Sequence, residues 1–221
     1  MTEEMIVESS SAAGSEQPSK TPGSEHLVRA GVYRLLAALL VSPPTPALLA
    51  TVRALHANDV ENASKNSATS SAMNAAWNNL VQAAEAHSAE QIEAEYFALF
   101  IGLGRGELLP YASWYLTGFL MEKPLARLRN RLQEMGLSRQ QGVNEPEDHV
   151  AALCETMSVI ITESRLSFKQ EQEFVETFVL SWMRRFFDDL REAESSEFYQ
   201  AVADVGRQFM LIEQQWFDYP P

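Results

Sequence analysis

The sequence predicts an all-α protein, a helical bundle. Apolar residues recur at three- and four-residue spacings along most of the chain, as helices with one buried face require. No stretch shows the sustained alternation of apolar and polar residues that is typical of strands. Proline, glycine and short capping sequences separate these helical patterns. Apolar residues make up 46% of the 221 residues, which is enough to build a core.

The first helix follows a polar segment, 1–24, whose serines, prolines and glycines predict a flexible arm. This helix covers 25–41, with Ser24 as its N-cap and Pro43-Pro44 as its stop. A short helix from Pro46 and a longer one over 72–86 come next, separated by the polar stretch 58–71. The capping box Ser88–Gln91 opens a helix that ends at Gly102.

The remaining helices repeat these signals. A segment rich in aromatic residues begins at Pro110, and a helix from Pro124 ends at Gly136. Pro146 is placed at the start of a helix whose apolar stripe runs from Val150 to Ile161. The capping box Ser167–Gln170 opens a helix expected to reach Leu190, and a serine at 195 or 196 caps the last helix, which runs to Trp216.

The interruption between Gly136 and Glu145 is the best candidate for a domain boundary. It predicts an N-terminal helical part, 25–141, and a C-terminal helical part, 142–221, joined by a hinge at Glu145-Pro-Glu-Asp-His149. Charge supports this division, because residues 1–144 carry 11 basic and 14 acidic residues (−3) and 145–221 carry 6 and 16 (−10). Gly142, Glu145, Pro146 and Glu147 are the predicted hinge residues.

The overall charge of −13 argues against a nucleic-acid backbone or an anionic membrane surface as partner. No run approaches the roughly 18 apolar residues of a membrane span, and the acidic start does not resemble a secretory leader. A single cysteine, Cys154, excludes an internal disulfide, and its place on an apolar stripe predicts a buried side chain. We therefore expect a soluble, acidic, intracellular protein.

Catalytic signatures are missing from the sequence. The glycines 102, 104 and 106 have the wrong spacing for a dinucleotide-binding loop, and no GKS or GKT sequence is present. There is no HExxH, and His26, His56 and His87 stand alone at helix ends or in loops, where we expect them to be solvated. These absences favour a binding protein over an enzyme, and we expect no metal or cofactor site.

One polar cluster, Glu145-Pro-Glu-Asp-His149, remains to be explained, and two interpretations are open. In the structural one, Glu147 and Asp148 complement a helix dipole while His149 bonds between the two halves. In the functional one, His149 donates to a bound partner and Asp148 accepts from a cationic one. Metal binding is a poor third, because adjacent positions on a helix do not face each other.

The aromatic segment after Pro110 is the second candidate for a binding site. Tyr111, Trp114, Tyr115 and Phe119 span more than one face of a helix, so one helix cannot bury them all. Some of them must pack on another element or line a groove. An aromatic groove on an acidic protein suits an apolar peptide with basic flanks.

Three stretches resemble the TorD/DmsD family. Glu95-Tyr-Phe-Ala-Leu-Phe-Ile-Gly102 is similar to its E-Y-x-x-L-F-x-G stretch, and Leu109-Pro-Tyr-Ala-Ser-Trp-Tyr115 to its P-x-x-S-x-Y turn. Gly136-Leu137 followed by Glu145-Pro-Glu-Asp-His-Val150 is similar to its E-P-x-D-H signature. The order and spacing of these motifs make the resemblance more specific than any one of them alone.

The resemblance implies an all-helical, non-enzymatic chaperone of the cytoplasm. Such proteins bind the twin-arginine signal peptide and the apo form of an exported molybdoenzyme until its molybdenum cofactor is inserted. By matching position, Pro146, Asp148 and His149 would bind the client, with Trp114 and Tyr115 as candidate groove residues. The family also implies weak guanine-nucleotide binding and, in some members, dimers formed by domain swapping.

Two alternatives to a client of the trimethylamine N-oxide or dimethyl sulfoxide reductase type stay open. The first is a chaperone for a nitrate reductase, whose client need not leave the cytoplasm. The second is a protein that binds and hydrolyses GTP at the hinge, although no phosphate loop is visible in the sequence.

Overall fold

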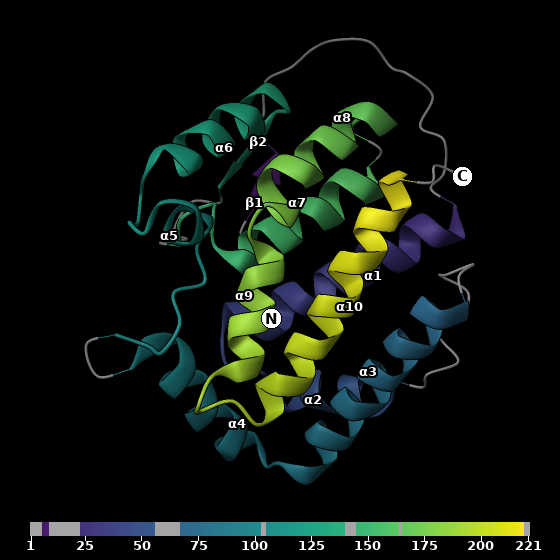
Figure 1. Cartoon of the computed structure of the whole chain (residues 1–221), viewed down its shortest axis with the longest axis vertical. Helices are drawn as coiled ribbons and strands as arrows, with labels where there is room; N and C mark the ends of the chain where they lie inside the picture. The colour runs from purple at the N-terminus through teal and green to yellow at the C-terminus, as the bar shows by residue number, and fades with distance from the viewer. Residues whose placement is uncertain are drawn as a thin grey trace. The chain divides into compact units, whose positions relative to one another are not determined.

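The computed structural model describes residues 6–8, 23–55, 67–102, 105–139, 145–163 and 165–218. These residues are predominantly helical, so the predicted all-α class is confirmed (Figure 1). None of the helices in these ranges is long and apolar enough to cross a membrane. The helices are α1 Ser24–Val41, α2 Pro46–Arg53, α3 Ser67–Ala86, α4 Ala89–Tyr96, α5 Ala112–Thr117, α6 Lys123–Glu134, α7 Val150–Thr162, α8 Phe168–Phe174, α9 Met183–Glu192 and α10 Phe198–Asp218.

Two short strands accompany the helices. β1, Ile6–Glu8, pairs antiparallel with β2, Leu137–Arg139, so that Ile6 lies opposite Arg139. Residues 6–8 thus have a backbone partner, although they belong to the predicted flexible arm, 1–24, which stays a prediction. The sequence signal there was only the apolar patch Met5 to Val7. Residues 1–5 and 9–22 of the arm lie outside the described residues.

The two predicted capping boxes are confirmed, whereas the last helix begins at Phe198, two positions beyond the predicted cap Ser196, and its first backbone N–H groups bond to Glu95. Ser88 and Ser167 each accept a hydrogen bond from the backbone N–H of the glutamine three residues later, Gln91 and Gln170, whose side chain bonds back to the serine N–H. Gly136 follows α6 with φ of 71°, a left-handed conformation in which glycine lacks the Cβ clash of other residues.

Two predicted helices are divided in the structure. A π-helical turn, Phe97–Ile101, continues α4, and a second one, Val175–Leu180, continues α8. The predicted helix from Ser167 to Leu190 then breaks at Trp182, whose φ of −147° is not helical, before α9 begins. The indole of Trp182 is buried, so tertiary packing sets this break and the periodic pattern does not reveal it.

The chain forms two compact units that are interleaved in sequence. Unit 1 comprises the described residues of Met1–Ala37 and Tyr111–Ser181, and unit 2 those of Ala38–Pro110 and Trp182–Pro221. This division differs from the predicted consecutive parts 25–141 and 142–221. The boundary passes through α1, whose first part belongs to unit 1 and whose last residues belong to unit 2.

Unit 1 is built around α7, whose side chains are almost all buried. Cys154 is fully buried there, as predicted, and burial raises the pKa of its thiol far above the ordinary value. Arg29 of α1, near the start of the unit's sequence, and Glu171 of α8, near its end, form a buried ion pair at 2.9 Å. Breaking such a pair leaves an uncompensated buried charge, so both residues are tied to the fold.

Unit 2 is organised around α10, which packs between α3 and α9 (Figure 1). Two buried tyrosines bond to the end of α1: the Tyr199 hydroxyl donates to the Leu39 carbonyl at 3.0 Å, and the Tyr96 hydroxyl to the Leu40 carbonyl at 3.4 Å. Buried carbonyl groups in the last turn of α1 therefore have hydrogen-bond partners, as buried polar groups usually do.

Candidate functional site

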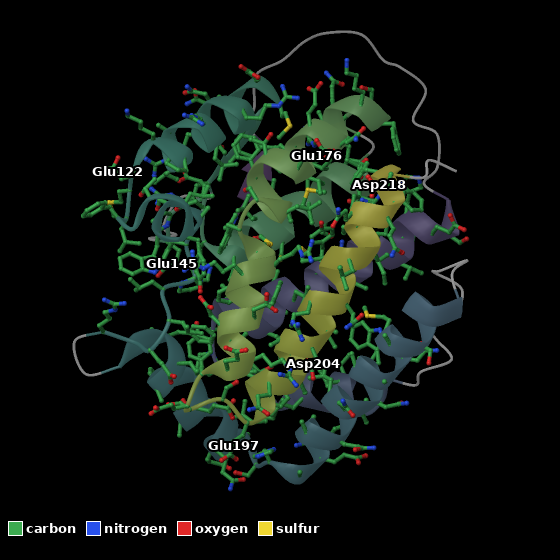
Figure 2. All side chains as sticks on the ribbon, viewed as in Figure 1. Glu122, Glu145, Glu176, Glu197, Asp204 and Asp218 are labelled. Atoms are coloured by element: carbon green, nitrogen blue, oxygen red, sulfur yellow. The ribbon has the colours of Figure 1, made fainter. Side chains whose placement is uncertain are left out.

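The predicted site residues lie on two segments of unit 1. Trp114 and Tyr115 belong to α5, and Glu145, Pro146, Glu147, Asp148 and His149 immediately precede α7. Figure 2 labels Glu145 beside α5. Gly142, predicted as part of the hinge, lies outside the described residues.

Backbone hydrogen bonds join the two segments. Tyr111 and His149 form an antiparallel bridge, and the Ala112 N–H donates to the Asp148 carbonyl at 2.9 Å. The His149 N–H donates to the Pro146 carbonyl at 3.1 Å, which closes a turn before the helix. Pro146 contributes only its carbonyl to this turn, because proline has no backbone N–H.

Asp148 is the side chain that holds α5. It is only 1% exposed, and its Oδ2 accepts a hydrogen bond of 2.9 Å from the Ser113 backbone N–H in the first turn of that helix. A carboxylate at a helix N-terminus satisfies an orphan donor and faces the positive end of the dipole. Within the described residues, Asp148 Oδ1 and the buried Ser113 Oγ have no hydrogen-bond partner.

His149 caps its own helix. Its Nδ1 accepts a hydrogen bond of 3.2 Å from the Ala151 N–H, which leaves the proton of the neutral ring on Nε2. The ring meets Tyr111 edge-on, with centroids 5.1 Å apart. Burial lowers the pKa of His149 to about 4, against an opposing attraction from the Glu145 carboxylate. The imidazole is therefore neutral at pH 7.

The two glutamates of the motif have separate partners. The Tyr111 hydroxyl donates to Glu145 Oε2 at 2.6 Å, and Arg129 of α6 donates to Glu147 Oε2 at 2.8 Å. Arg139 of β2 donates to the Glu145 carbonyl at 3.3 Å. Donors from α6, β2 and the segment before α5 therefore all bond to the Glu145–His149 motif, which links these three elements.

The structural interpretation of the motif needs a correction. We expected Glu147 and Asp148 in the first turn of the helix that begins at Pro146, and His149 bonded between two halves. The helix instead begins at Val150, so both acids lie before it, and Asp148 serves the dipole of α5 rather than that of α7. His149 bonds to its own helix and packs on Tyr111, which lies in the same unit.

The aromatic segment is divided between buried and exposed positions, as its pattern required. Trp114 and Tyr115 are half-buried on α5, which ends at Gly118 with φ of 80°. The residues around that end are exposed and apolar, with Phe119 at 69% and Met121 at 75%. Phe119 was part of the predicted aromatic segment, whereas Leu116, Leu120 and Met121 were not. For Leu120 and Met121 the Thr117-Gly118 stop was the available signal, because residues beyond it cannot pack as part of α5.

The stretch Glu95 to Gly102 has a structural role within unit 2. Glu95 accepts hydrogen bonds of 2.7–3.0 Å from the backbone N–H groups of Glu197, Phe198 and Tyr199 at the start of α10. Gly102 has φ of 60° and leaves no room for a Cβ beside the Arg105 carbonyl. The motif therefore fixes the start of a long helix. The neighbouring Gly104 lies outside the described residues.

His87 differs from its prediction as a solvated histidine. It is half-buried, with Nδ1 at 2.9 Å from the Ala83 carbonyl and Nε2 at 3.1 Å from Glu197. The bond to the Ala83 carbonyl and the proximity of Glu197 raise the pKa of His87. The described residues contain no group of three His, Cys, Asp or Glu side chains arranged to hold a metal ion. His56 lies outside them.

A family model described as nitrate reductase delta subunit matches residues 66–188, more than half of the chain and the whole of the site above. The chain belongs to this family. Similar proteins include those named chaperone protein TorD from Vibrio atlanticus, 26% identical over 57% of this chain and 64% of that protein, and from Photobacterium profundum, 26% identical over 62% and 70%. The predicted relationship to the TorD family is confirmed.

The similarity covers different shares of the two relatives. The chain spans less than two thirds of the length of the Vibrio atlanticus protein. A crystal structure described as a redox enzyme maturation protein from Archaeoglobus fulgidus aligns with a TM-score of 0.53 and 19% identity, over 89% of this chain and 99% of that one. That likeness concerns the fold. The named TorD relatives are chaperones rather than enzymes, in agreement with the non-enzymatic prediction.

Proposed function

We propose that this TorD-family protein is a cytoplasmic chaperone that binds the twin-arginine signal peptide and the apo form of an exported molybdoenzyme. The client would be of the trimethylamine N-oxide or dimethyl sulfoxide reductase type. The chaperone would hold the client during insertion of the molybdenum cofactor and so proofread its export. The proposal rests chiefly on the relatives named chaperone protein TorD, together with the family model, which matches the region that contains the site.

The geometry of α5 supports a peptide-binding role. Trp114 and Tyr115 are half-buried, so each combines a fixed orientation with a surface that a partner can cover. Glu145, also half-buried, accepts a hydrogen bond from Tyr111, which directly precedes α5. In our proposal its carboxylate also accepts from an arginine of the leader. Asp148 and His149 are buried, which favours a role in positioning α5 over direct contact with the peptide.

Calorimetric titration with twin-arginine leaders from the host's molybdoenzymes tests this function. Each leader is paired with a control peptide that lacks its apolar stretch. We expect one leader to bind, its control to fail, and Trp114→Ala and Tyr115→Ala to weaken binding by about tenfold each, as aromatic anchors do. Leu27→Ser, at an exposed apolar position on α1, is the matched variant that should bind normally. A well-folded protein that binds no leader would refute the proposal.

A nitrate reductase client is the second candidate, and the description of the matching family model favours it. The two candidates differ in the client, so capture of partners by the intact chain from host extracts separates them. Recovery of a nitrate reductase subunit without any leader-bearing enzyme would support the second. Weak guanine-nucleotide binding and domain-swapped dimers stay predictions, which nucleotide titration and sedimentation of the full chain would check.

A further inference from the structure

The exposed apolar residues at the end of α5 form one continuous stretch of chain. We call Leu116, Phe119, Leu120 and Met121 the α5–α6 tip; all four side chains are exposed. Singly exposed apolar residues are ordinary on a protein surface, but four within six positions form a patch of the kind that marks an interaction site. The tip belongs to unit 1 and lies between the two helices of an α5–α6 pair.

The backbone of the tip is constrained as well as exposed. Met121 has φ of 59°, a left-handed conformation that costs a non-glycine residue roughly 1 kcal/mol or more. Thr117 Oγ1 donates to the Ser113 carbonyl at 2.7 Å and accepts from the Phe119 N–H at 3.2 Å. The tip therefore follows a helix, α5, whose first turn is bonded to Asp148 through the Ser113 N–H. Such strain persists where the surrounding structure enforces it, often at ligand-binding positions.

The charged side chains of α6 indicate which kind of partner the tip binds. α6 carries four cations and one acid in 12 residues, on a protein whose overall charge is −13. Arg129 pairs with Glu147 and Arg131 with Glu134. Lys123 and Arg127 are exposed, have no ion-pair partner among the described residues, and lie four residues apart on one helix face. Glu122, exposed at the start of α6 (Figure 2), offsets one of these charges.

From this arrangement we infer that the α5–α6 tip, with Lys123 and Arg127, docks an apolar segment of a client protein that carries acidic residues. The identity of the partner as a client rests on the proposed function. Apolar side chains of the segment cover the tip, and its carboxylates meet the two cations. This chemistry is the opposite of a twin-arginine leader, whose basic residues Lys123 and Arg127 would repel, so the tip serves a different part of the client.

Two other occupants fit less well. An anionic membrane covers a face much larger than the tip, so on a protein with a net charge of −13 it meets acidic as well as basic side chains. A second copy of this chain carries the same net charge, which opposes association. A short peptide segment interacts mainly with charges within the screening length of about 8 Å, so the local cations dominate its binding.

The test uses fluorescence anisotropy with three designed peptides that share one leucine- and phenylalanine-rich sequence. One is flanked by aspartates, one by lysines and one by serines. We expect the aspartate peptide to bind most tightly, and Phe119→Ser or Met121→Ser to weaken it by about tenfold. The double change Lys123→Glu with Arg127→Glu should reverse the preference toward the lysine peptide, and Glu122→Gln should tighten the aspartate peptide by about two- to fivefold.

Matched variants keep the result specific to this surface. Lys169→Glu changes an exposed cation of α8, and Leu27→Ser an exposed leucine of α1; both should bind the aspartate peptide as the unchanged chain does. Equal binding of the lysine and aspartate peptides overturns the inference. Loss of self-association in Phe119→Ser by sedimentation, or pelleting with phosphatidylserine vesicles that this variant abolishes, also overturns it. A chain that binds leaders but not the aspartate peptide loses this inference alone.

Discussion

Asp148 Oδ2 lies 2.9 Å from the backbone nitrogen of Ser113, so a residue just before α7 caps a helix 35 positions earlier in the chain. The E-P-x-D-H motif thereby positions α5. Its aspartate and histidine are buried, so we expect them to influence a bound peptide through α5 rather than by direct contact. This relationship changes what substitution of these residues should do.

Asp148→Ala should destabilise the fold. The Asp148 side chain is buried and accepts a hydrogen bond from the Ser113 backbone N–H. Removing the acceptor strands the Ser113 N–H, which costs about 1–3 kcal/mol. Denaturant unfolding should show this loss, and Asp148→Asn, which keeps an acceptor oxygen, should lose less. An unfolding midpoint for Asp148→Ala equal to that of the unchanged chain would exclude the capping role.

His149 should make the protein less stable in mild acid. Its folded pKa of about 4 lies below the ordinary value of 6.5, so between these values the unfolded chain binds more protons. Stability from this group is therefore complete above about pH 6.5 and declines as the pH falls toward 4. His149→Asn retains a capping oxygen but cannot titrate, so its unfolding free energy should vary less over this range.

His87 provides a control of opposite sign for that measurement. Its pKa is raised, so its contribution is complete below the ordinary value of 6.5 and declines as the pH rises through its folded pKa. His87→Asn should therefore remove a stabilisation seen in acid. If His149→Asn and His87→Asn change the pH dependence in the same direction, the environment assigned to one of the two rings is wrong.

Glu95→Ala should loosen the start of α10. The carboxylate accepts three backbone N–H groups there, and their loss should cost roughly 1–3 kcal/mol. Hydrogen exchange should become faster at 197–199 in this variant. Glu93→Ala, an exposed neighbour on α4, should change stability by no more than about 0.5 kcal/mol. Unchanged exchange in Glu95→Ala would mean that another group caps α10 in solution.

Two helical glycines should respond in opposite ways to alanine. A Cβ at Gly206 of α10 would overlap the ring of Phe187, whereas a Cβ at Gly31 of α1 would meet nothing within 4 Å. Gly206→Ala should therefore destabilise the protein by about 1–3 kcal/mol, as overpacking does. Gly31→Ala should stabilise it by about 0.5–1 kcal/mol, because alanine favours helix. Thermal unfolding of both variants measures the contrast.

The sequence predicted most of the secondary structure because its signals are local. Ser88 and Ser167 bond to residues three positions away, and Gly136 ends α6 through its own backbone conformation. The motifs also located the candidate site, since Trp114, Tyr115 and the residues 145–149 do come together in unit 1. The capping signals lie within a window of a few residues, whereas the site residues were found through the order and spacing of three motifs between Glu95 and Val150.

Long-range pairing accounts for what the sequence did not reveal. The start of α7 at Val150 follows from the bridge between Tyr111 and His149, which no local pattern encodes. The pairing of β1 with β2 joins residues that are far apart in the chain, and the break at Trp182 follows from burial of its indole. Asp148 looked like an acid for its own helix because the donor that it serves, Ser113, is remote in sequence.

The interleaving of the two units has a consequence for synthesis on the ribosome. Unit 1 needs its segment up to Ser181, and unit 2 needs the segment that follows, up to the end of the chain. Residues Ala38–Pro110 therefore emerge long before α9 and α10, which complete their core. The apolar faces of α3 and α4 that pack on α10 stay uncovered during that interval, so the nascent chain passes through a stage at which it is a candidate for assistance from general chaperones.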